Sequence, residues 1–220
     1  MLRVLAWLTP VAIVGALAGA RWGGEFVAWA LPDADGHGAW YASRASGIAA
    51  YLCLWVGLVG GLLMSSAWFD GIVNRARLLV IHQTASVAGI LLGFGHALIL
   101  IPDTWTQFGP IDVLVPFGSY YERVDLAIGS LSLYLMTIVA ASFWVRRSLG
   151  MRLWRLLHYS SFVAFAGALW HGIRVGTDSN ESWLMGLYFV TSLAVVFALV
   201  LRLTYVRETR RKARPGTSIA

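Results

Sequence analysis

Four histidines lie inside long apolar stretches of this chain and form two groups with nearly equal spacing. The first group is His82 and His96, and the second is His158 and His171. Ionisable side chains inside a membrane-spanning segment are energetically costly and are candidates for function. Imidazole nitrogen binds haem iron and several transition metals. The spacing therefore predicts metal or haem sites within a membrane domain.

The composition is that of an integral membrane protein. The chain has 220 residues, of which 58% are hydrophobic and 13% charged, and its mean hydropathy is +0.69. About a quarter of the residues of a soluble domain are charged. The formal charge of +6 does not indicate nucleic-acid binding, because the basic residues lie in short stretches between apolar runs. The single cysteine, Cys53, rules out a CxxC metal site, and the lack of CxxCH argues against covalent c-type haem.

Six apolar runs are long enough to cross a hydrocarbon core of ~30 Å, which takes about 20 helical residues. Continuous runs in lipid must be helical, because their backbone groups have to be satisfied internally. The sequence thus predicts an all-α fold, a six-transmembrane helix bundle over residues 1–206 with a basic tail over 207–220. The expected spans are 3–20, 45–67, 77–101, 124–145, 151–173 and 182–204.

The first run admits two interpretations. Arg3, an apolar stretch and ALAGA ending at Ala20 also fit a secretory signal with a small-residue cleavage site. We favour a retained helix, and the topology of the remaining spans is the same in both cases.

The distribution of arginine and lysine predicts the orientation. With six spans, both termini and the second and fourth loops share one side of the membrane, and that side holds most of the basic residues. The opposite side holds only Arg21, Arg44, Arg123 and Arg174. The positive-inside rule places the basic side in the cytoplasm. We expect a protein of a bacterial cytoplasmic membrane with both termini cytoplasmic.

The histidines fall at two matched depths. His82 and His158 lie near the cytoplasmic start of their spans, and His96 and His171 follow 14 and 13 residues later. At ~1.5 Å per residue these second positions are about 20 Å nearer the outside. A haem between two helices takes one axial nitrogen from each, and two haems would form an electron path across the membrane.

An ideal straight helix over the fifth span would not direct both of its histidines at one partner. Fourteen residues return to within about 40° of the same helix face, whereas thirteen leave an offset of about 140°. Helix tilt, a π-bulge or a kink near Gly167 could absorb the offset.

The two segments HQTASVAGILLGFGH and HYSSFVAFAGALWHG resemble the ferric reductase-like transmembrane domain. Ferric reductases, NADPH oxidases and the haem subunit of the bacterial periplasmic methionine sulfoxide reductase share that domain, and the likeness covers roughly residues 40–204. It implies two haem b groups with bis-histidine ligation, His82 with His158 on the inner haem and His96 with His171 on the outer. The methionine sulfoxide reductase subunit lacks a histidine at the position of His82, so this chain is more similar to the two-haem members.

Three arginines are candidate partners of the haem carboxylates. Arg44 in YASRASGIAAYL is similar in position to a family arginine beside the outer haem, and guanidinium binds carboxylates bidentately. Arg75 and Arg77 precede His82 and could serve the inner haem in the same way. Positive-inside charge explains Arg75 and Arg77 equally well.

Small residues in the apolar runs indicate close approach of helices or of a cofactor. They are the GLVGG stretch of the second span and Gly89, Gly93 and Gly95 of the third. They do not form a dinucleotide fingerprint, because none follows a strand and opens a helix.

We expect no flavin or nicotinamide site in this chain. About sixteen residues follow the last span, whereas a nucleotide-binding domain needs on the order of 100. Electrons should therefore come from a separate donor protein or a quinol. They would pass to an extracytoplasmic acceptor such as a ferric chelate, oxygen or a partner protein. The chain would then be an oxidoreductase subunit. Membrane lipid is a further expected partner, and nucleic acid is not.

Other functions remain open. The histidines could belong to a membrane transporter or metal-ion channel without haem, although no inverted repeat, broken helix pair or buried mid-membrane carboxylate supports this. A haem-bearing anchor that only recruits a soluble partner is a further alternative, and the lack of HExxH argues against a metalloprotease. Asp33, Asp35 and His37 could bind a metal ion, but a solvated loop is the favoured interpretation.

Overall fold

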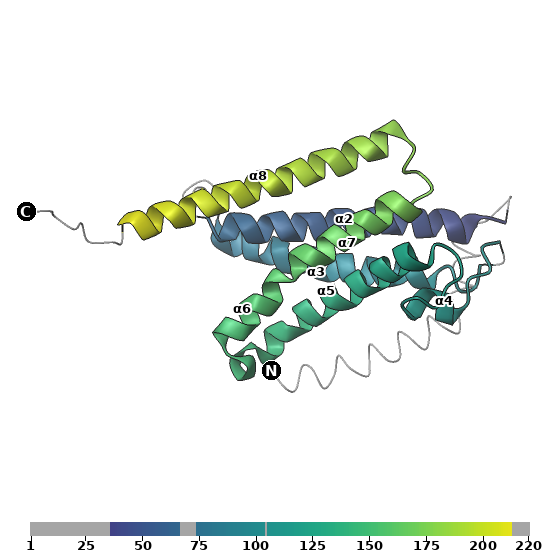
Figure 1. The fold of residues 1–220 in the computed structure, drawn as a ribbon, viewed down its shortest axis with the longest axis horizontal. Coiled ribbons are helices and arrows are strands. Elements are labelled where there is room, and N and C mark those ends of the chain that lie inside the picture. Colours follow the sequence, from purple (N-terminus) through teal and green to yellow (C-terminus); the bar gives the residue numbers. More distant parts are fainter. Residues whose placement is uncertain (1–35, 67–73, 104, 213–220) are drawn as a thin grey trace, which may run out of the picture.

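The computed structural model describes residues 36–66, 74–103 and 105–212, and this part of the chain is all-helical without strands. The all-α class predicted from the sequence is confirmed for these residues. The helices are α2 (Gly38–Met64), α3 (Arg75–Leu98), α4 (Pro110–Leu114), α5 (Arg123–Leu149), α6 (Met151–Tyr159), α7 (Ser161–Val175) and α8 (Ser182–Lys212) (Figure 1).

Four helices of the described part are long and apolar enough to cross a membrane. They are Gly38–Met64, Arg75–Leu98, Arg123–Leu149 and, within α8, Ser182–Thr209. They correspond to the predicted spans that begin at residues 45, 77, 124 and 182, and the structure supports a membrane protein to this extent. The first predicted span, 3–20, lies outside the described residues. Helix α8 continues to Lys212, past residue 206 where the predicted membrane domain ends.

The predicted span 151–173 is not one continuous helix. It divides into α6 and α7 at Ser160, whose N–H and hydroxyl both donate to the carbonyl of Leu157, at 3.1 and 2.6 Å. Local bonds of this kind compete with the regular i to i−4 ladder and bend helices. The bend thus lies at Ser160 and not near Gly167, which α7 passes through without interruption. It separates the helix of His158 from that of His171.

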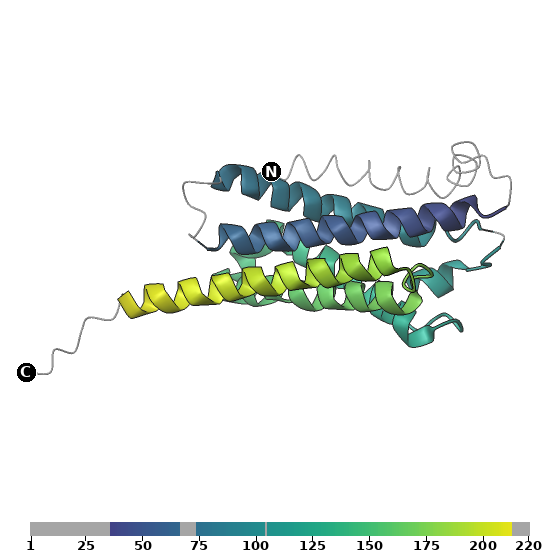
Figure 2. The ribbon, with the colours of Figure 1, turned by 90° about the horizontal axis from the view of Figure 1, so that it is seen from above.

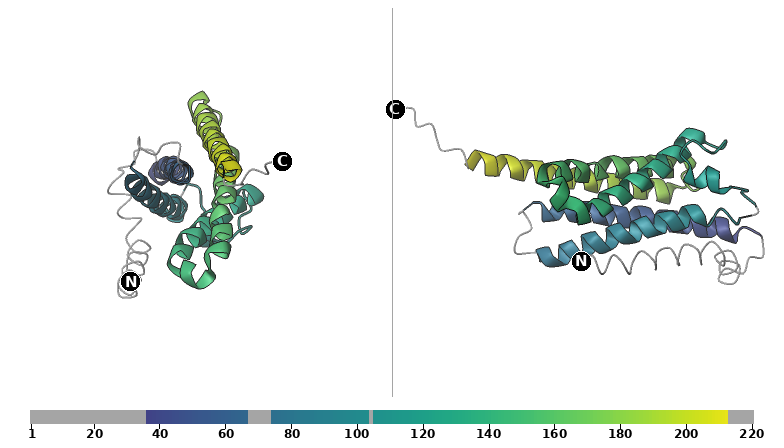
Figure 3. Two further views of the ribbon diagram at one scale, coloured as in Figure 1. Left: turned by 90° about the vertical axis from the view of Figure 1, so that its left-hand side faces the viewer. Right: turned by 90° about the horizontal axis from the view of Figure 1, so that it is seen from below.

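The helices form two layers. Helix α2 packs along α3, and α5 packs along α7, while α8 lies against α2. Figures 2 and 3 show α2 and α3 as one layer and α5, α6 with α7, and α8 as the other. Two of the four histidines lie on α3 and the other two on α6 and α7, so the layers present histidines to each other.

The two ends of the bundle differ in charge. Helix α6, the start of α3 and the last turns of α2 and α5 lie at one end, and α4 lies at the other (Figure 1). We call these the α6 end and the α4 end. The α6 end carries the basic residues expected on the cytoplasmic side, including Arg146, Arg147, Arg152 and Arg155. The side of the membrane that each end faces stays a prediction.

An aromatic cluster joins the two layers. Tyr51 of α2 stacks on Phe165 of α7, with ring centroids 5.3 Å apart, and meets Tyr188 of α8 edge-on at 5.1 Å. The Thr191 hydroxyl donates to the Leu187 carbonyl at 2.7 Å, so it accepts the bond from the Tyr51 hydroxyl at 2.6 Å. The cluster ties α8 to the helices around the histidines.

Replacing Thr191 with valine is expected to destabilise the fold. The buried Tyr51 hydroxyl would lose its acceptor, and an unsatisfied buried polar group costs about 1–3 kcal/mol. The midpoint of thermal unfolding in detergent should fall by several degrees. Thr191→Ser keeps the hydroxyl and should stay near the wild-type midpoint; equal loss in both variants would contradict the hydrogen-bond explanation.

Candidate functional site

The structure brings the four histidines together as two facing pairs. The rings of His82 and His158 have centroids 6.1 Å apart and are inclined at 67°. The rings of His96 and His171 are also 6.1 Å apart and are inclined at 79°. These are the pairings expected from the sequence, His82 with His158 toward the α6 end and His96 with His171 toward the α4 end. Their role as metal ligands stays a prediction.

The separation within each pair suits one metal ion held by both imidazoles. Two imidazole nitrogens at ~2.0 Å from a shared metal, on opposite sides, place the ring centroids about 6 Å apart. The observed 6.1 Å in both pairs therefore fits bis-histidine ligation of an iron.

Backbone carbonyls fix the tautomer of three of these rings. In each case Nδ1 lies at hydrogen-bond distance from a carbonyl oxygen: His82 from Gly57 at 2.7 Å, His96 from Ser43 at 2.8 Å, and His171 from Asp125 at 2.9 Å. A carbonyl only accepts, so Nδ1 carries the proton and Nε2 keeps the lone pair. Metal-binding histidines are commonly oriented in this way.

The fourth ring is held by stacking. His158 lies 5.1 Å from the ring of Trp154, with an interplanar angle of 22°. The two residues are four apart on α6 and so share one face of that helix. The stacking restricts rotation of the imidazole and so keeps it paired with His82.

Three glycines leave space that histidine rings occupy, and we call each such glycine position the seat of its ring. A Cβ atom built on Gly47 would lie 2.8 Å from Nδ1 of His96, and one on Gly129 would lie 2.5 Å from Nδ1 of His171. On Gly61 it would lie 3.3 Å from Nδ1 of His82. Side chains at the first two positions would collide with the rings. Sequence reasoning missed Gly47 and Gly129 because each is a lone glycine in an apolar run.

The glycines singled out in the sequence have different surroundings. A Cβ on Gly89 or Gly93 would lie 2.9 Å from Leu54 of α2 or Leu133 of α5, so both glycines permit close approach of helices. Gly95, in contrast, has no atom within 4 Å of the added Cβ.

A cavity of about 540 Å³ contains the His96–His171 pair. This volume lies within the range of ~300–1,000 Å³ typical of ligand pockets. Most of its lining is apolar, from residues such as Leu54, Leu133 and Leu184, and charged side chains join it from the α4 end. The cavity suits a large apolar group with a polar edge, which is the character of haem.

Arg44 lines this cavity and already has an acidic partner. Its Nε donates to Oδ2 of Asp178 at 2.8 Å, its Nη2 contacts Oδ1 of the same carboxylate, and its guanidinium lies 4.2 Å from the ring centre of Trp40. The predicted role of Arg44, binding a haem carboxylate, would thus share the guanidinium with Asp178. The sequence did not point to Asp178, which is 134 residues away.

Arg75 and Arg77 occupy a different place. Both are exposed in the first turn of α3, at the α6 end, and neither lines the cavity around His96 and His171. Their predicted role beside the inner haem concerns the other histidine pair.

His37 lies at the α4 end, where its ring contacts that of Trp105 at 4.6 Å. Asp33 and Asp35, its predicted companions in a metal site, lie outside the described residues. Within the described ranges, no group of three or more His, Cys, Asp or Glu side chains is arranged to hold a metal ion.

Comparison of the chain with models of known families, with curated proteins and with solved structures found no match. The resemblance to the ferric reductase-like transmembrane domain therefore rests on the four histidines, their spacing and the position of Arg44.

Proposed function

We propose that this chain is a di-haem b electron-transfer protein of the membrane, the membrane subunit of a reductase. It would take electrons from a cytoplasmic or membrane-bound donor and deliver them to an extracytoplasmic acceptor. One observation carries the proposal. Two pairs of facing imidazoles, each with a centroid separation of 6.1 Å, lie between the same two helix layers.

The chain's own residues would supply ligation and orientation. His82 with His158, and His96 with His171, would hold one haem each, and haem supplies one-electron chemistry when bound. The carbonyls of Gly57, Ser43 and Asp125 hold three of the imidazoles with Nδ1 protonated, which leaves Nε2 free to bind iron.

The spacing along α3 supports transfer across the membrane. His82 and His96 are 14 residues apart on one helix, or about 20 Å along its axis. This is a large part of a hydrocarbon core of ~30 Å. Each leaflet would therefore contain one of the two sites. A single site could not span this distance.

The donor would approach the α6 end. That end carries Arg146, Arg147, Arg152 and Arg155, which could attract an acidic donor protein or an anionic lipid surface. A quinol could reach the same depth from the bilayer. The acceptor, a ferric chelate, oxygen or a partner protein, would meet the α4 end.

The pair geometry favours haem over a transporter or channel that binds bare metal ions. Protein sites for zinc and similar ions use three or four protein ligands. Each pair here offers two imidazoles, and the cavity around His96 and His171 is mostly apolar. A porphyrin would provide the remaining iron ligands and fill such a space.

The proposal is tested by the absorption spectrum of the full chain purified from haem-sufficient cells. We expect a low-spin b-type spectrum, with an α-band on reduction, and about two haems per chain by extraction. A folded, colourless preparation would overturn the proposal, and metal-ion flux by that preparation in vesicles would favour a channel.

A further inference from the structure

Asp125 is a buried carboxylate next to one of the predicted iron ligands. It lies in the first turn of α5, at the α4 end, and is only 8% exposed. An unpaired carboxylate is costly to bury, so Asp125 requires polar partners.

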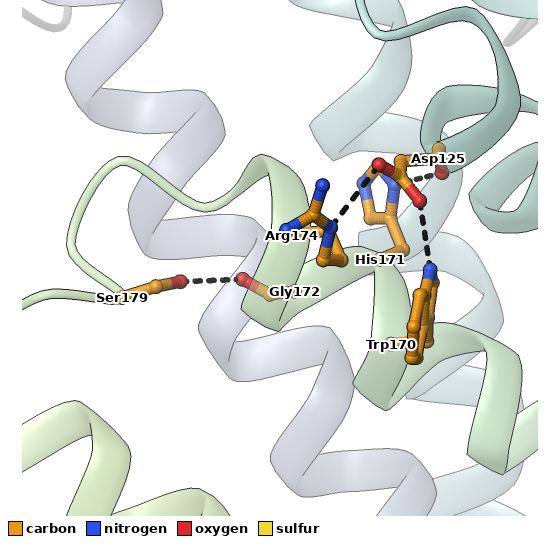
Figure 4. Close-up of polar contacts among 6 residues, drawn as sticks. All are labelled: Asp125, Trp170, His171, Gly172, Arg174 and Ser179. Carbon is orange, nitrogen blue, oxygen red and sulfur yellow. Dashed lines mark hydrogen bonds and ion pairs between the residues drawn. The ribbon is translucent and has the colours of Figure 1, made fainter.

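Three donors from α7 converge on Asp125 (Figure 4). Its backbone carbonyl accepts from Nδ1 of His171 at 2.9 Å, and its Oδ1 accepts from Nε1 of Trp170 at 2.7 Å. Its Oδ2 lies 3.4 Å from Nε of Arg174. Two neighbouring side chains of α7 are thus fixed by one residue of α5.

The charge of Asp125 makes the His96–His171 pair different from the other. Ser43 and Gly57, the residues whose carbonyls hold His96 and His82, are uncharged. Only at His171, among these three imidazoles, does the residue that orients the ring also carry a carboxylate.

The counter-charge on Arg174 does not cancel this effect. The Arg174 side chain is 55% exposed, whereas that of Asp125 is 11% exposed. Charges in contact with solvent are screened, and buried charges are screened much less. Of the two charges in this ion pair, the Asp125 carboxylate is therefore the less screened one beside His171.

We propose that Asp125 is a positioning residue that lowers the reduction potential of the His96–His171 site. The inference rests on the proposed function, because it needs a haem between these two histidines. A nearby negative charge stabilises the oxidised, more positive form of an iron site, and burial strengthens the effect. The site would then be a stronger reductant than it would be without this charge. Asp125 acts through His171 and through its field, and it does not itself bind the metal.

The test is a redox titration of the full, haem-loaded chain, followed by its visible spectrum. In Asp125→Asn the carboxylate is lost while the backbone carbonyl that orients His171 remains. We expect the midpoint potential of one of the two one-electron waves to rise by about 59 mV, which is a tenfold change in its reduction equilibrium constant. The equilibrium constant of the other wave should change by less than a factor of two.

Two further variants separate charge from shape. Asp125→Glu keeps the charge, and the reduction equilibrium constant of this wave should lie within threefold of the wild-type value. Arg174→Gln removes the exposed counter-charge and should move the same wave in the opposite direction, by at least twofold.

The outcomes decide between the inference and the proposed function. Two unshifted waves in a two-haem Asp125→Asn preparation would overturn the role of Asp125. If that variant loses a haem, Arg174→Gln decides alone, and a rise or no shift in its wave overturns the inference. Failure of the wild-type chain to bind haem would instead overturn the proposed function.

Discussion

Replacing His171 with alanine is expected to lower the haem content from about two per chain to about one. His171 and His96 are the two facing imidazoles of one pair, so either substitution removes one side of the same site. A single imidazole cannot provide both axial nitrogens of a bis-histidine iron. The remaining haem should keep the low-spin spectrum of the His82–His158 pair.

Double variants sharpen this expectation. His96→Ala combined with His171→Ala should lose no more haem than either alone, because both act on one site. His82→Ala combined with His171→Ala should lose both haems. His37→Ala is the matched control, since His37 contacts Trp105 outside both pairs and should leave two haems in place. Two haems in His171→Ala would disprove the pairing.

The second large effect is expected from Gly129→Ala, which adds one carbon atom in α5. An added Cβ would lie 2.5 Å from Nδ1 and 2.7 Å from Cγ of His171, and it would push the ring from its seat. Overpacking of this kind costs about 1–3 kcal/mol, which is a factor of about 5 to 150 in the binding equilibrium. We expect the haem of the His96–His171 site to be mostly lost.

A glycine with open space around it provides the control. Gly95 is next to His96 on α3, and no atom lies within 4 Å of an added Cβ. Gly95→Ala should keep two haems and could stabilise the helix slightly, because alanine is favoured over glycine by about 1 kcal/mol. Full haem content in Gly129→Ala, measured by extraction per chain, would contradict the proposed seat.

The long helices were predictable because their signal is local. Apolar runs of the required length predicted α2, α3, α5 and α8, whose observed bounds differ from the predicted spans by a few residues at most ends. The matched histidine spacing likewise predicted which rings would face each other. Helical rise along two spans that both begin on the predicted cytoplasmic side is enough to place His82 level with His158 and His96 level with His171.

A departure from a straight helix in the fifth predicted span was among the expectations, but its position at Ser160 was not. The phase offset of about 140° over 13 residues left helix tilt, a π-bulge or a kink near Gly167 open as ways to direct both His158 and His171 at one partner. The position of the break depends on Ser160, whose N–H and hydroxyl both bond to the Leu157 carbonyl. A serine in an apolar run has other conformations open to it, so its presence alone did not locate the bend.

The sequence by itself determined the membrane character of the chain, its long helices and the pairing of its four histidines. These follow from hydrophobic length and helical rise, which act along the chain. The tertiary structure alone decided that Gly129 seats His171, that Asp178 pairs with Arg44, and that Asp125 orients His171. Such contacts join residues tens of positions apart, and whether they form depends on how the two helix layers pack.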